Sequence, residues 1–466
     1  MAVKFYNYLT KKIEVFKPLK NKAASLYTCG PTVHNYTHIG NLRTFIFEDI
    51  LRRILEYSGY KVTQVMNITN VEDKIIRDSK AAGKTIFEFV RPYEKAFFDD
   101  LKNLNIETAH KYPKATKHVS EMIKIIELLI KKKLAYEASD SIYFNISKFK
   151  KYGRLSGLKL RELKSGARTD ADEYAKGNAE NFVLWKAAKA GEPSWNADFS
   201  SAGPAFAKAM AGRPGWHIEC SAMSMKYLGP TFDIHAGAVD LIFPHHENEI
   251  AQSEGATGKK FVNYFIEGEH LLVNSEKMSK SLGNVYTLRD IEKRNFDPLA
   301  FRYLTLTAHY RSKLNFTWKS LAAAQNALDN LREAVANLKI EIRKKTSEVK
   351  PCSEAKLLLL GEFEKHIYND LGMPQALAVL WEVIKSEKLS ADIKYSLITD
   401  FDKVLGLNLA DVKTEKIPSQ ILKLAKDREK HRKEKNFKKA DELRKKIESL
   451  GWLIEDTPQG PKLKKK

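Results

Sequence analysis

The chain has 466 residues, of which 43% are hydrophobic, and it carries a formal net charge of +21. Its length predicts about three domains, the lack of an apolar run of about 18 residues excludes a transmembrane helix, and three cysteines are too few for a disulfide framework. The basic excess favours a polyanionic partner, nucleic acid before a membrane. Because the first residues lack a continuous apolar segment, we expect no signal peptide and a cytoplasmic protein.

The first part of the chain alternates strand and helix patterns. "SLYTCG" predicts a strand that ends at Gly30–Pro31, and apolar residues spaced three and four apart predict a helix from about Asn41 to Tyr57. "KVTQVMNIT" predicts the next strand. Strand, helix and strand in this order form a βαβ unit, so we expect a parallel sheet.

The middle and the end of the chain differ from this pattern. Residues from about 110 to 215 form a mixed insertion, and a second α/β segment runs from Trp216 to about Val285. A helical pattern follows from about Ser320 to Leu405. The last part predicts a charged helical pair, with 18 Lys and Arg against 10 Asp and Glu from Asp411 onward, and a disordered "GPKLKKK" at the end. A charge run of this kind is most often a solvated surface.

Residues 243–252, "FPHHENEIAQ", place two histidines beside two glutamates. Pro244 suits the first position of a helix because it needs no N–H there. On such a helix Glu249 shares a face with both His245 and His246. The pattern fits a metal site, an acid–base site or a polar helix end, and the segment alone leaves all three open.

Two further motifs suggest phosphate binding. In "CGPTVHNYTHIGN" a strand ends and a helix begins, and a helix N-terminus presents free N–H groups to anions. His38 and Asn41, on either side of Gly40, can hold a phosphate there. In "KMSKS" Lys277 and Lys280 can neutralise a triphosphate. Either motif alone is more often a helix cap or a solvated loop.

Taken together and in order, the motifs resemble cysteinyl-tRNA synthetases, a family of class I aminoacyl-tRNA synthetases. The resemblance rests on "CGPTVHNYTHIGNLRTF", "NITNVEDKI", "NFVLWKAAKAGEPSW", "RPGWHIECSAMS", "FPHHENEIAQS", "EKMSKSLGN" and the C-terminal "KKADELRKKIESLGWLIEDTPQG". It implies an α/β fold, with a Rossmann-type class I catalytic domain split by a connective insertion, an α-helical bundle and a small C-terminal anticodon-binding domain. The implied boundaries are 1–110 and 216–285 for the catalytic halves, 111–215 for the insertion, 286–320 for a stem-contact region, 321–408 for the bundle and 409–466 for the last domain.

The resemblance also implies a zinc site. Its ligands would be Cys29, Cys220, His245 and Glu249, and thiolate, imidazole and carboxylate ligands suit Zn²⁺. One ion per chain would select the substrate thiolate, because shape alone separates cysteine from serine by only about 10–200-fold. No editing site is then needed. Without the resemblance, each cysteine is as well explained as a small buried hydrophobe.

The implied reaction joins cysteine to tRNA(Cys) through a cysteinyl-adenylate, with ATP and Mg²⁺ as the energy source. The residues implied for catalysis are His38, Asn41, Lys277 and Lys280. Those implied for the nucleotide are Gly30, His38, Gly40, Asn41 and Lys280. The amino-acid and adenosine pocket would contain Cys29, Thr69, Trp216, His235 and Asp240, although Trp216 and His235 also fit a core. Contacts with tRNA would come from Arg428, Arg432, Lys433, Lys435, Arg444 and Trp452. We expect a monomer.

Several residues depart from the family pattern, and two other functions compete. The departures are His34, Asn70, Glu72, Ala236, Ala238, Phe265, Glu267, Glu269 and about ten extra residues before Arg213. One alternative is a ligase that transfers the cysteinyl group to a small amine, as in mycothiol biosynthesis, but the basic C-terminal tail favours tRNA. The other is an inactive paralogue that binds RNA or zinc, and the intact motifs argue against it.

Overall fold

The computed structural model describes residues 1–138, 141–158, 174–175, 178–200, 210–279, 281–344, 353–413, 418–457 and 460–465. The chain divides into two compact units, Met1–Ala410 and Asp411–Lys466. Each unit is described by itself below. The resemblance places the start of the last domain at residue 409, two residues before this division.

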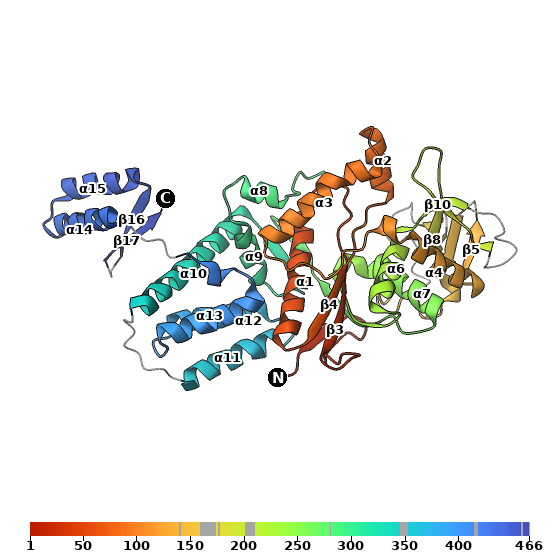
Figure 1. Ribbon diagram of the computed structural model, residues 1–466, viewed down its shortest axis with the longest axis horizontal. Helices are drawn as coiled ribbons and strands as arrows, with labels where there is room; N and C mark the ends of the chain where they lie inside the picture. The colour runs from red at the N-terminus through yellow and green to blue at the C-terminus, as the bar shows by residue number, and fades with distance from the viewer. Residues whose placement is uncertain are drawn as a thin grey trace. The chain divides into compact units, whose positions relative to one another are not determined.

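A four-stranded parallel sheet forms the centre of the first unit, in the order β12-β11-β3-β4 (Figure 1). Its strands are β3 (Ala23–Thr28), β4 (Lys61–Met66), β11 (Phe232–Ala238) and β12 (Val262–Gly268). Two strands come from each side of the insertion, which confirms the predicted parallel sheet of a split α/β domain. The split matters for function, because chain segments about 200 residues apart meet at one sheet edge.

Helix α1 (Ile39–Tyr57) connects β3 to β4 and begins two residues earlier than the apolar pattern predicts. His38 caps it, because the ring Nδ1 accepts a hydrogen bond from the N–H of Asn41 at 3.2 Å. The face with Leu42, Ile46 and Ile54 is buried. Burial of side chains of this size contributes roughly 1.5–3 kcal/mol each, which holds the helix start at a fixed place beside the sheet.

A second sheet belongs to the insertion and is antiparallel, in the order β5-β6-β8-β10-β9, with β7 paired to β8. Its strands are β5 (Ala135–Ala138), β6 (Ser141–Asn145), β7 (Tyr174–Ala175), β8 (Asn178–Ala187), β9 (Trp195–Ala197) and β10 (Met210–Pro214). The helices before it are α2 (Asp73–Ala81), α3 (Ile86–Asn103) and α4 (Val119–Lys131). Helices α6 (Trp216–Leu228) and α7 (Glu247–Thr257) pack on α4 and return the chain to the parallel sheet.

The remaining elements of the first unit are two small sheets and a group of helices. The strands are β1 (Lys4–Asn7) with β2 (Lys12–Val15), and β14 (Glu276–Lys277), β13 (Leu271–Val273) and β15 (Leu314–Phe316) in that order. The helices are α8 (Leu288–Glu292), α9 (Pro298–Leu306), α10 (Trp318–Lys344), α11 (Ser353–Ile367), α12 (Met373–Lys385) and α13 (Ala391–Leu405). Helix α13 lies beside α10 and α12 (Figure 1), in agreement with the predicted helical region.

A buried charge cluster ties these helices to α1. The Arg302 side chain is fully buried and donates to Asp49 Oδ2 at 2.6 Å and to the carbonyl oxygens of Leu405 and Leu104 at 2.7 and 3.0 Å. Burial alone would raise the pKa of Asp49, but Arg302 and Arg53 hold it below its usual range. The helix that begins at the HIGN motif, residues 38–41, is therefore joined firmly to the end of α13.

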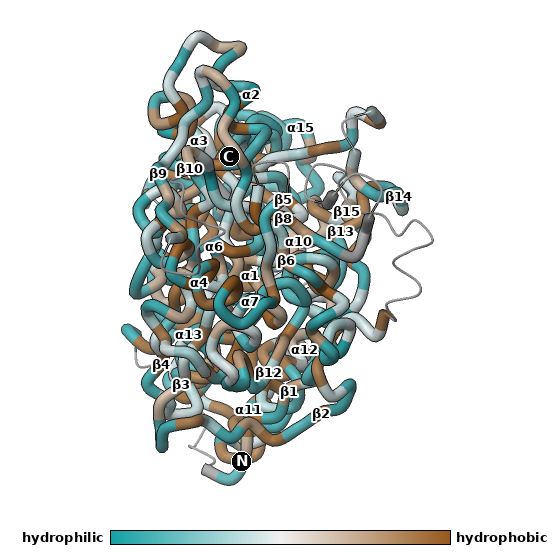
Figure 2. The backbone as a smooth tube through the Cα atoms, turned by 90° about the vertical axis from the view of Figure 1, so that its right-hand side faces the viewer, coloured by the Kyte–Doolittle hydropathy of each residue, from teal (hydrophilic) through white to brown (hydrophobic). Residues whose placement is uncertain are grey.

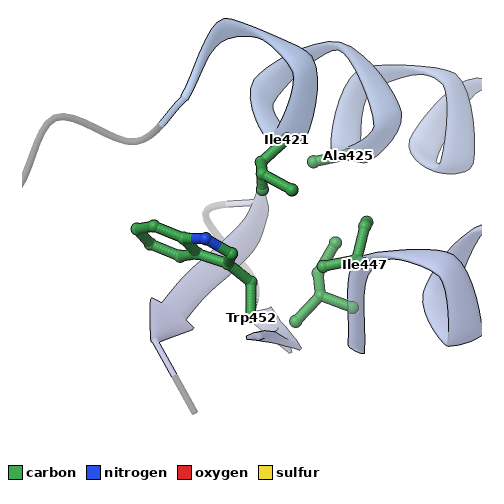
Figure 3. Packing of buried hydrophobic residues seen from close by; sticks show 5 residues of the cluster. Ile421, Ala425, Ile447 and Trp452 are labelled. Carbon is green, nitrogen blue, oxygen red and sulfur yellow. The ribbon is translucent and has the colours of Figure 1, made fainter. Parts of the chain in front are cut away.

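The second unit contains α14 (Ser419–Lys433), α15 (Phe437–Ser449) and an antiparallel hairpin of β16 (Trp452–Thr457) and β17 (Gly460–Lys465). Figure 3 shows its core, where Ile421 and Ala425 of α14 face Ile447 and Trp452. The predicted helical pair is present. The predicted disorder of "GPKLKKK" is wrong for residues 460–465, because this segment pairs with β16 and Leu463 packs against the core.

Figure 2 shows hydrophobic and hydrophilic segments interspersed along the chain, as expected where helices bury one face and expose the other. Within the described ranges, no helix is both long and apolar enough to cross a membrane.

Candidate functional site

The candidate site lies at the carboxyl edge of the parallel sheet. Cys29 directly follows β3, Asn67 follows β4, and Val239 follows β11. Such an edge is where open α/β sheets bind ligands. The backbone is tight here, because a Cβ on Gly30 would lie 1.8 Å from the carbonyl oxygen of Asn67. Only glycine fits at this turn.

Four predicted ligand residues meet at this edge. One ligand atom from each of Cys29, Cys220, His245 and Glu249 lies within 4.8 Å of the others, and all four residues are buried. Cys29 comes from the end of β3, Cys220 from α6, His245 from the turn before α7 and Glu249 from α7. Two sulfurs, a ring nitrogen and a carboxylate oxygen form a donor set that fits a tetrahedral Zn²⁺ ion.

The segment "FPHHENE" differs slightly from the predicted helix. Residues Ile242–His246 form a wide turn with an extended Phe243, and regular helix begins at Glu247 rather than at Pro244. His245 and Glu249 still lie one turn apart, with Nε2 and Oε1 separated by 3.1 Å. The predicted shared face is therefore confirmed.

Neighbouring histidines hold the ligand side chains in place. His235 Nε2 lies 2.9 Å from Glu249 Oε2, and His217 Nδ1 lies 2.8 Å from His245 Nδ1. Burial would raise the pKa of Glu249, but His235 and His245 bring it below its ordinary value. Glu249 is therefore an anion in a fixed orientation. His235 lies behind this carboxylate, fully buried, which fits a supporting contact better than the substrate contact implied by the resemblance.

A second set of residues satisfies the same distance criterion. It consists of Cys29, His235, His246 and Glu249, and it shares two members with the first set. His246 Nε2 lies 3.4 Å from Cys29 Sγ, and its Nδ1 lies 2.9 Å from Glu267 Oε1. The two sets therefore overlap at Cys29 and Glu249.

The thiol of Cys29 is not an anion in the protein without metal. Burial, with Cys220 close by, raises the pKa of Cys29 well above its ordinary value. A coordinating cation reverses this effect, because a thiol bound to a metal ion is deprotonated. Binding of a divalent cation by this arrangement would therefore release protons.

The HIGN and KMSKS motifs lie against each other. The N–H of Ile39 donates to the carbonyl oxygen of Tyr286 at 2.8 Å, and a Cβ on Gly40 would lie 2.5 Å from the Met278 side chain. Asn41 and Lys277 are exposed, and the predicted residue Lys280 lies outside the described residues. Burial lowers the pKa of His38, so this ring is neutral at pH 7.

The other predicted pocket residues lie near the ligand cluster. The Trp216 ring stacks on His245, with centroids 4.4 Å apart, and Thr69 Oγ1 donates to Glu219 Oε2 at 2.9 Å. The Asp240 side chain is 59% exposed, 4.0 Å from the His270 ring. Trp216 and Thr69 thus line the cluster from α6 and from the segment after β4.

The predicted tRNA contacts divide into two groups. Trp452 is buried in the core of the second unit, and Arg428 is buried and bonded to both carboxylate oxygens of Asp456 at 2.7 and 2.9 Å. These two residues stabilise the unit and do not suit direct contact with RNA. The exposed members are Arg432, Lys433, Lys435 and Arg444. Of these, Arg432 also pairs with Asp456. Phe437, with 60% of its surface exposed, is the available aromatic residue.

Two buried carboxylates are absent from the predicted set. Glu267 holds His246 through one oxygen, and its other oxygen has no hydrogen-bond partner among the described residues. Glu48 of α1 is buried, and neither of its oxygens has a described partner. Burial raises the pKa of both groups well above the ordinary range. Glu267 stands out in the sequence as a departure from the family; no sequence signal marks Glu48.

Comparisons with known proteins define the class. Residues 15–326 match the family model "tRNA synthetases class I (C) catalytic domain". A methionyl-tRNA synthetase of Mycobacterium tuberculosis, in complex with methionyl-adenylate, has the same fold, with a TM-score of 0.59 at 14% identity over 83% of this chain and 90% of that chain. A LeuRS of Agrobacterium radiobacter K84 has a TM-score of 0.60 at 11% identity over 85% of each chain. The fold is that of class I synthetases.

Curated relatives narrow the family further. The cysteine--tRNA ligase of Protochlamydia amoebophila is 43% identical over 100% of this chain and 98% of its own length. Those of Brachyspira hyodysenteriae and Methanosarcina mazei are 44% and 43% identical, with at least 98% of each chain covered. The chain belongs to the cysteine--tRNA ligase family of class I aminoacyl-tRNA synthetases, which confirms the resemblance seen in the sequence.

Proposed function

We propose that this protein joins cysteine to tRNA(Cys) at the expense of ATP, through a cysteinyl-adenylate. The observation that carries the proposal is the buried cluster of Cys29, Cys220, His245 and Glu249, in which Cys29 lies at the end of β3, the strand that leads into α1 and its HIGN motif. A buried donor set with two sulfurs suits recognition of a thiol-containing amino acid. Membership in the cysteine--tRNA ligase family supports the same substrate.

The cluster would hold one Zn²⁺ ion through these four residues. A bound Zn²⁺ ion supplies a soft Lewis acid that favours a thiolate over an alcohol. The first ligand set is preferred because it contains both cysteines and because His246 is held by Glu267. The remaining groups orient the ligands: His235 holds Glu249, and Trp216 stacks on His245.

The first chemical step needs no base from the protein. The cysteine carboxylate attacks the α-phosphorus of ATP, pyrophosphate leaves, and charge develops on the phosphate oxygens. The N-terminus of α1, with His38 and Asn41, faces this charge, and Lys277 and Lys280 would neutralise the pyrophosphate, with Mg²⁺ on the phosphates. In the second step the terminal ribose hydroxyl of tRNA attacks the acyl carbonyl, and AMP leaves.

The domain roles follow the same proposal. Residues 1–110 and 216–285 form the catalytic halves, 111–215 the insertion, 286–320 a stem-contact region and 321–408 the helical bundle. The second unit would read the anticodon through Lys433, Lys435 and Arg444, with Phe437 stacking on a base. The protein would act as a monomer in the cytoplasm.

Two assays test the proposal. Cysteine-dependent exchange between ATP and pyrophosphate measures adenylate formation, and charging of tRNA(Cys) measures transfer. We expect both activities in protein that contains about one zinc per chain. Exchange without charging would favour transfer to a small amine. Absence of exchange in zinc-containing protein would contradict the proposed function.

A further inference from the structure

A groove outside the ligand cluster has the properties of a binding site for single-stranded RNA. It is a cavity of about 620 Å³ between α3 and the segment before α4. Its lining includes Phe87, Arg91 and Lys95 from α3, Lys114 and Lys117 from the facing segment, and Asn70 at its base. We call this cavity the α3 groove.

The charge of the α3 groove favours a polyanion. Its lining holds four basic residues and one acidic residue, Glu94, which pairs with Lys114 at 2.5 Å. Lys95 pairs with Asp99 on the exposed surface. Arg91 and Lys117 are exposed and form no ion pair with any described residue, so two cations on opposite walls are available to phosphates.

An aromatic side chain accompanies these cations. Phe87 lies on the lining with 56% of its surface exposed, although a phenyl ring of this kind is usually buried in a soluble protein. A cationic groove with an exposed aromatic ring is the combination that binds single-stranded nucleic acid, since the ring stacks on a base while the cations neutralise the backbone.

The α3 groove is connected to the candidate active site through its base. The Asn70 side chain makes two hydrogen bonds with Thr116: its Nδ2 donates to Thr116 Oγ1, and its Oδ1 accepts from the backbone N–H of Thr116. Asn70 follows Thr69, whose hydroxyl bonds to Glu219, the neighbour of Cys220. The groove wall and the ligand cluster are thus attached to one short segment after β4.

We propose that the α3 groove binds the single-stranded 3′ end of tRNA and guides it to the site where the cysteinyl group is transferred. The inference rests on the proposed function, in which the terminal ribose hydroxyl must reach the adenylate. A nucleotide chain bound in the groove would contact Arg91, Lys117 and Phe87, beside the buried Asn70, whose neighbour Thr69 bonds to Glu219.

Binding of two RNAs to the full-length protein tests this inference: intact tRNA(Cys) and the same tRNA without its unpaired 3′ nucleotides. In R91A/K117A, we expect the affinity for intact tRNA to fall about tenfold or more. The slope of log affinity against log salt should decrease in magnitude by about 1.4, because each lost contact with a single strand contributes about 0.7. F87A should weaken the binding of intact tRNA by about fivefold or more, because the variant loses a stacking contact with a base. Neither variant should change the binding of the shortened tRNA.

A matched control comes from a second basic depression of the same unit. K150A/K151A removes the same charge from exposed residues on its lining and should bind both RNAs as the unaltered protein does. Equal losses with both RNAs, an equal loss in this control, or no loss in the groove variants would each overturn the inference. Cysteine-dependent pyrophosphate exchange needs no tRNA, so its absence in the unaltered protein would instead overturn the proposed function.

Discussion

The ligand cluster and the KMSKS segment form two parts of one candidate site, and they are built in opposite ways. Cys29, Cys220, His245 and Glu249 are buried and held by neighbouring rings, whereas Lys277 is exposed at the end of a short strand. Recognition of one sulfur atom needs ligands at fixed distances. Neutralisation of a polyphosphate needs a cation that can follow the charge. The contrast predicts that substitutions in the two regions impair the protein in different ways.

The largest effect is expected from loss of a thiol ligand. C220S should remove bound zinc and lower cysteine-dependent pyrophosphate exchange by about 10³-fold or more, because a substrate that cannot make the bond a site is built around reacts by orders of magnitude more slowly. Metal analysis and exchange kinetics on the same preparation measure both quantities. Retained zinc with full activity would show that Cys220 is only a buried hydrophobe.

The exposed region should respond differently. K277A should lower kcat of exchange by about 10²-fold, as loss of one charge-stabilising group does. Its zinc content and its free energy of unfolding should stay the same, since exposed substitutions change stability by about 0.5 kcal/mol or less. A loss of zinc in this variant would break the proposed division between the two regions.

A smaller effect is expected behind the ligand cluster. Glu267 holds His246, which contacts the Cys29 sulfur. E267A should weaken zinc binding by about tenfold, a common effect for groups that orient metal ligands, and E267Q should restore most of it. Competition with a chelator measures the affinity. Equal affinities in all three proteins would show that this contact does not position Cys29.

The last effect changes stability and not metal binding or catalysis, and it concerns Glu48, a buried carboxylate without a hydrogen-bond partner among the described residues. Burial raises the pKa of Glu48, so the folded state binds this proton more tightly than the unfolded state. The contribution of Glu48 to the free energy of unfolding is therefore greatest at low pH and falls as the pH rises from the ordinary carboxyl pKa through the raised one. E48Q should be about 1–3 kcal/mol more stable than the unaltered protein near pH 8 and equal to it near pH 4, by thermal unfolding. A parallel pH dependence in both proteins would contradict this account of Glu48.

Local patterns predicted much of the fold and some of the site. The spacing of apolar residues located α1 to within two residues at its start, and the order of strand and helix gave the parallel sheet. The disorder predicted for residues 460–465 was wrong, because pairing with β16 depends on a partner that the local pattern does not show. Trp452 was predicted to contact tRNA, but it is buried in the core of the second unit by packing that the local sequence does not show.

The helix face alone did not decide between His245 and His246. In the fold both histidines precede α7 and lie close to Cys29 and Glu249, and His246 also contacts Glu267 of β12. The orphan carboxylate of Glu48 was invisible in the sequence, since a polar residue inside an amphipathic helix is usually exposed. Tertiary contacts decide which of these side chains are buried and which approach the cluster.

The most direct test of the central claim is the ratio of kcat/KM for cysteine to that for serine in pyrophosphate exchange, with zinc bound, after its removal and after its return. If the buried cluster selects the thiol, the ratio should fall toward the roughly 10–200-fold that shape alone provides and recover with zinc. A ratio that is unchanged by removal of zinc, in protein that remains folded and active, would contradict the account.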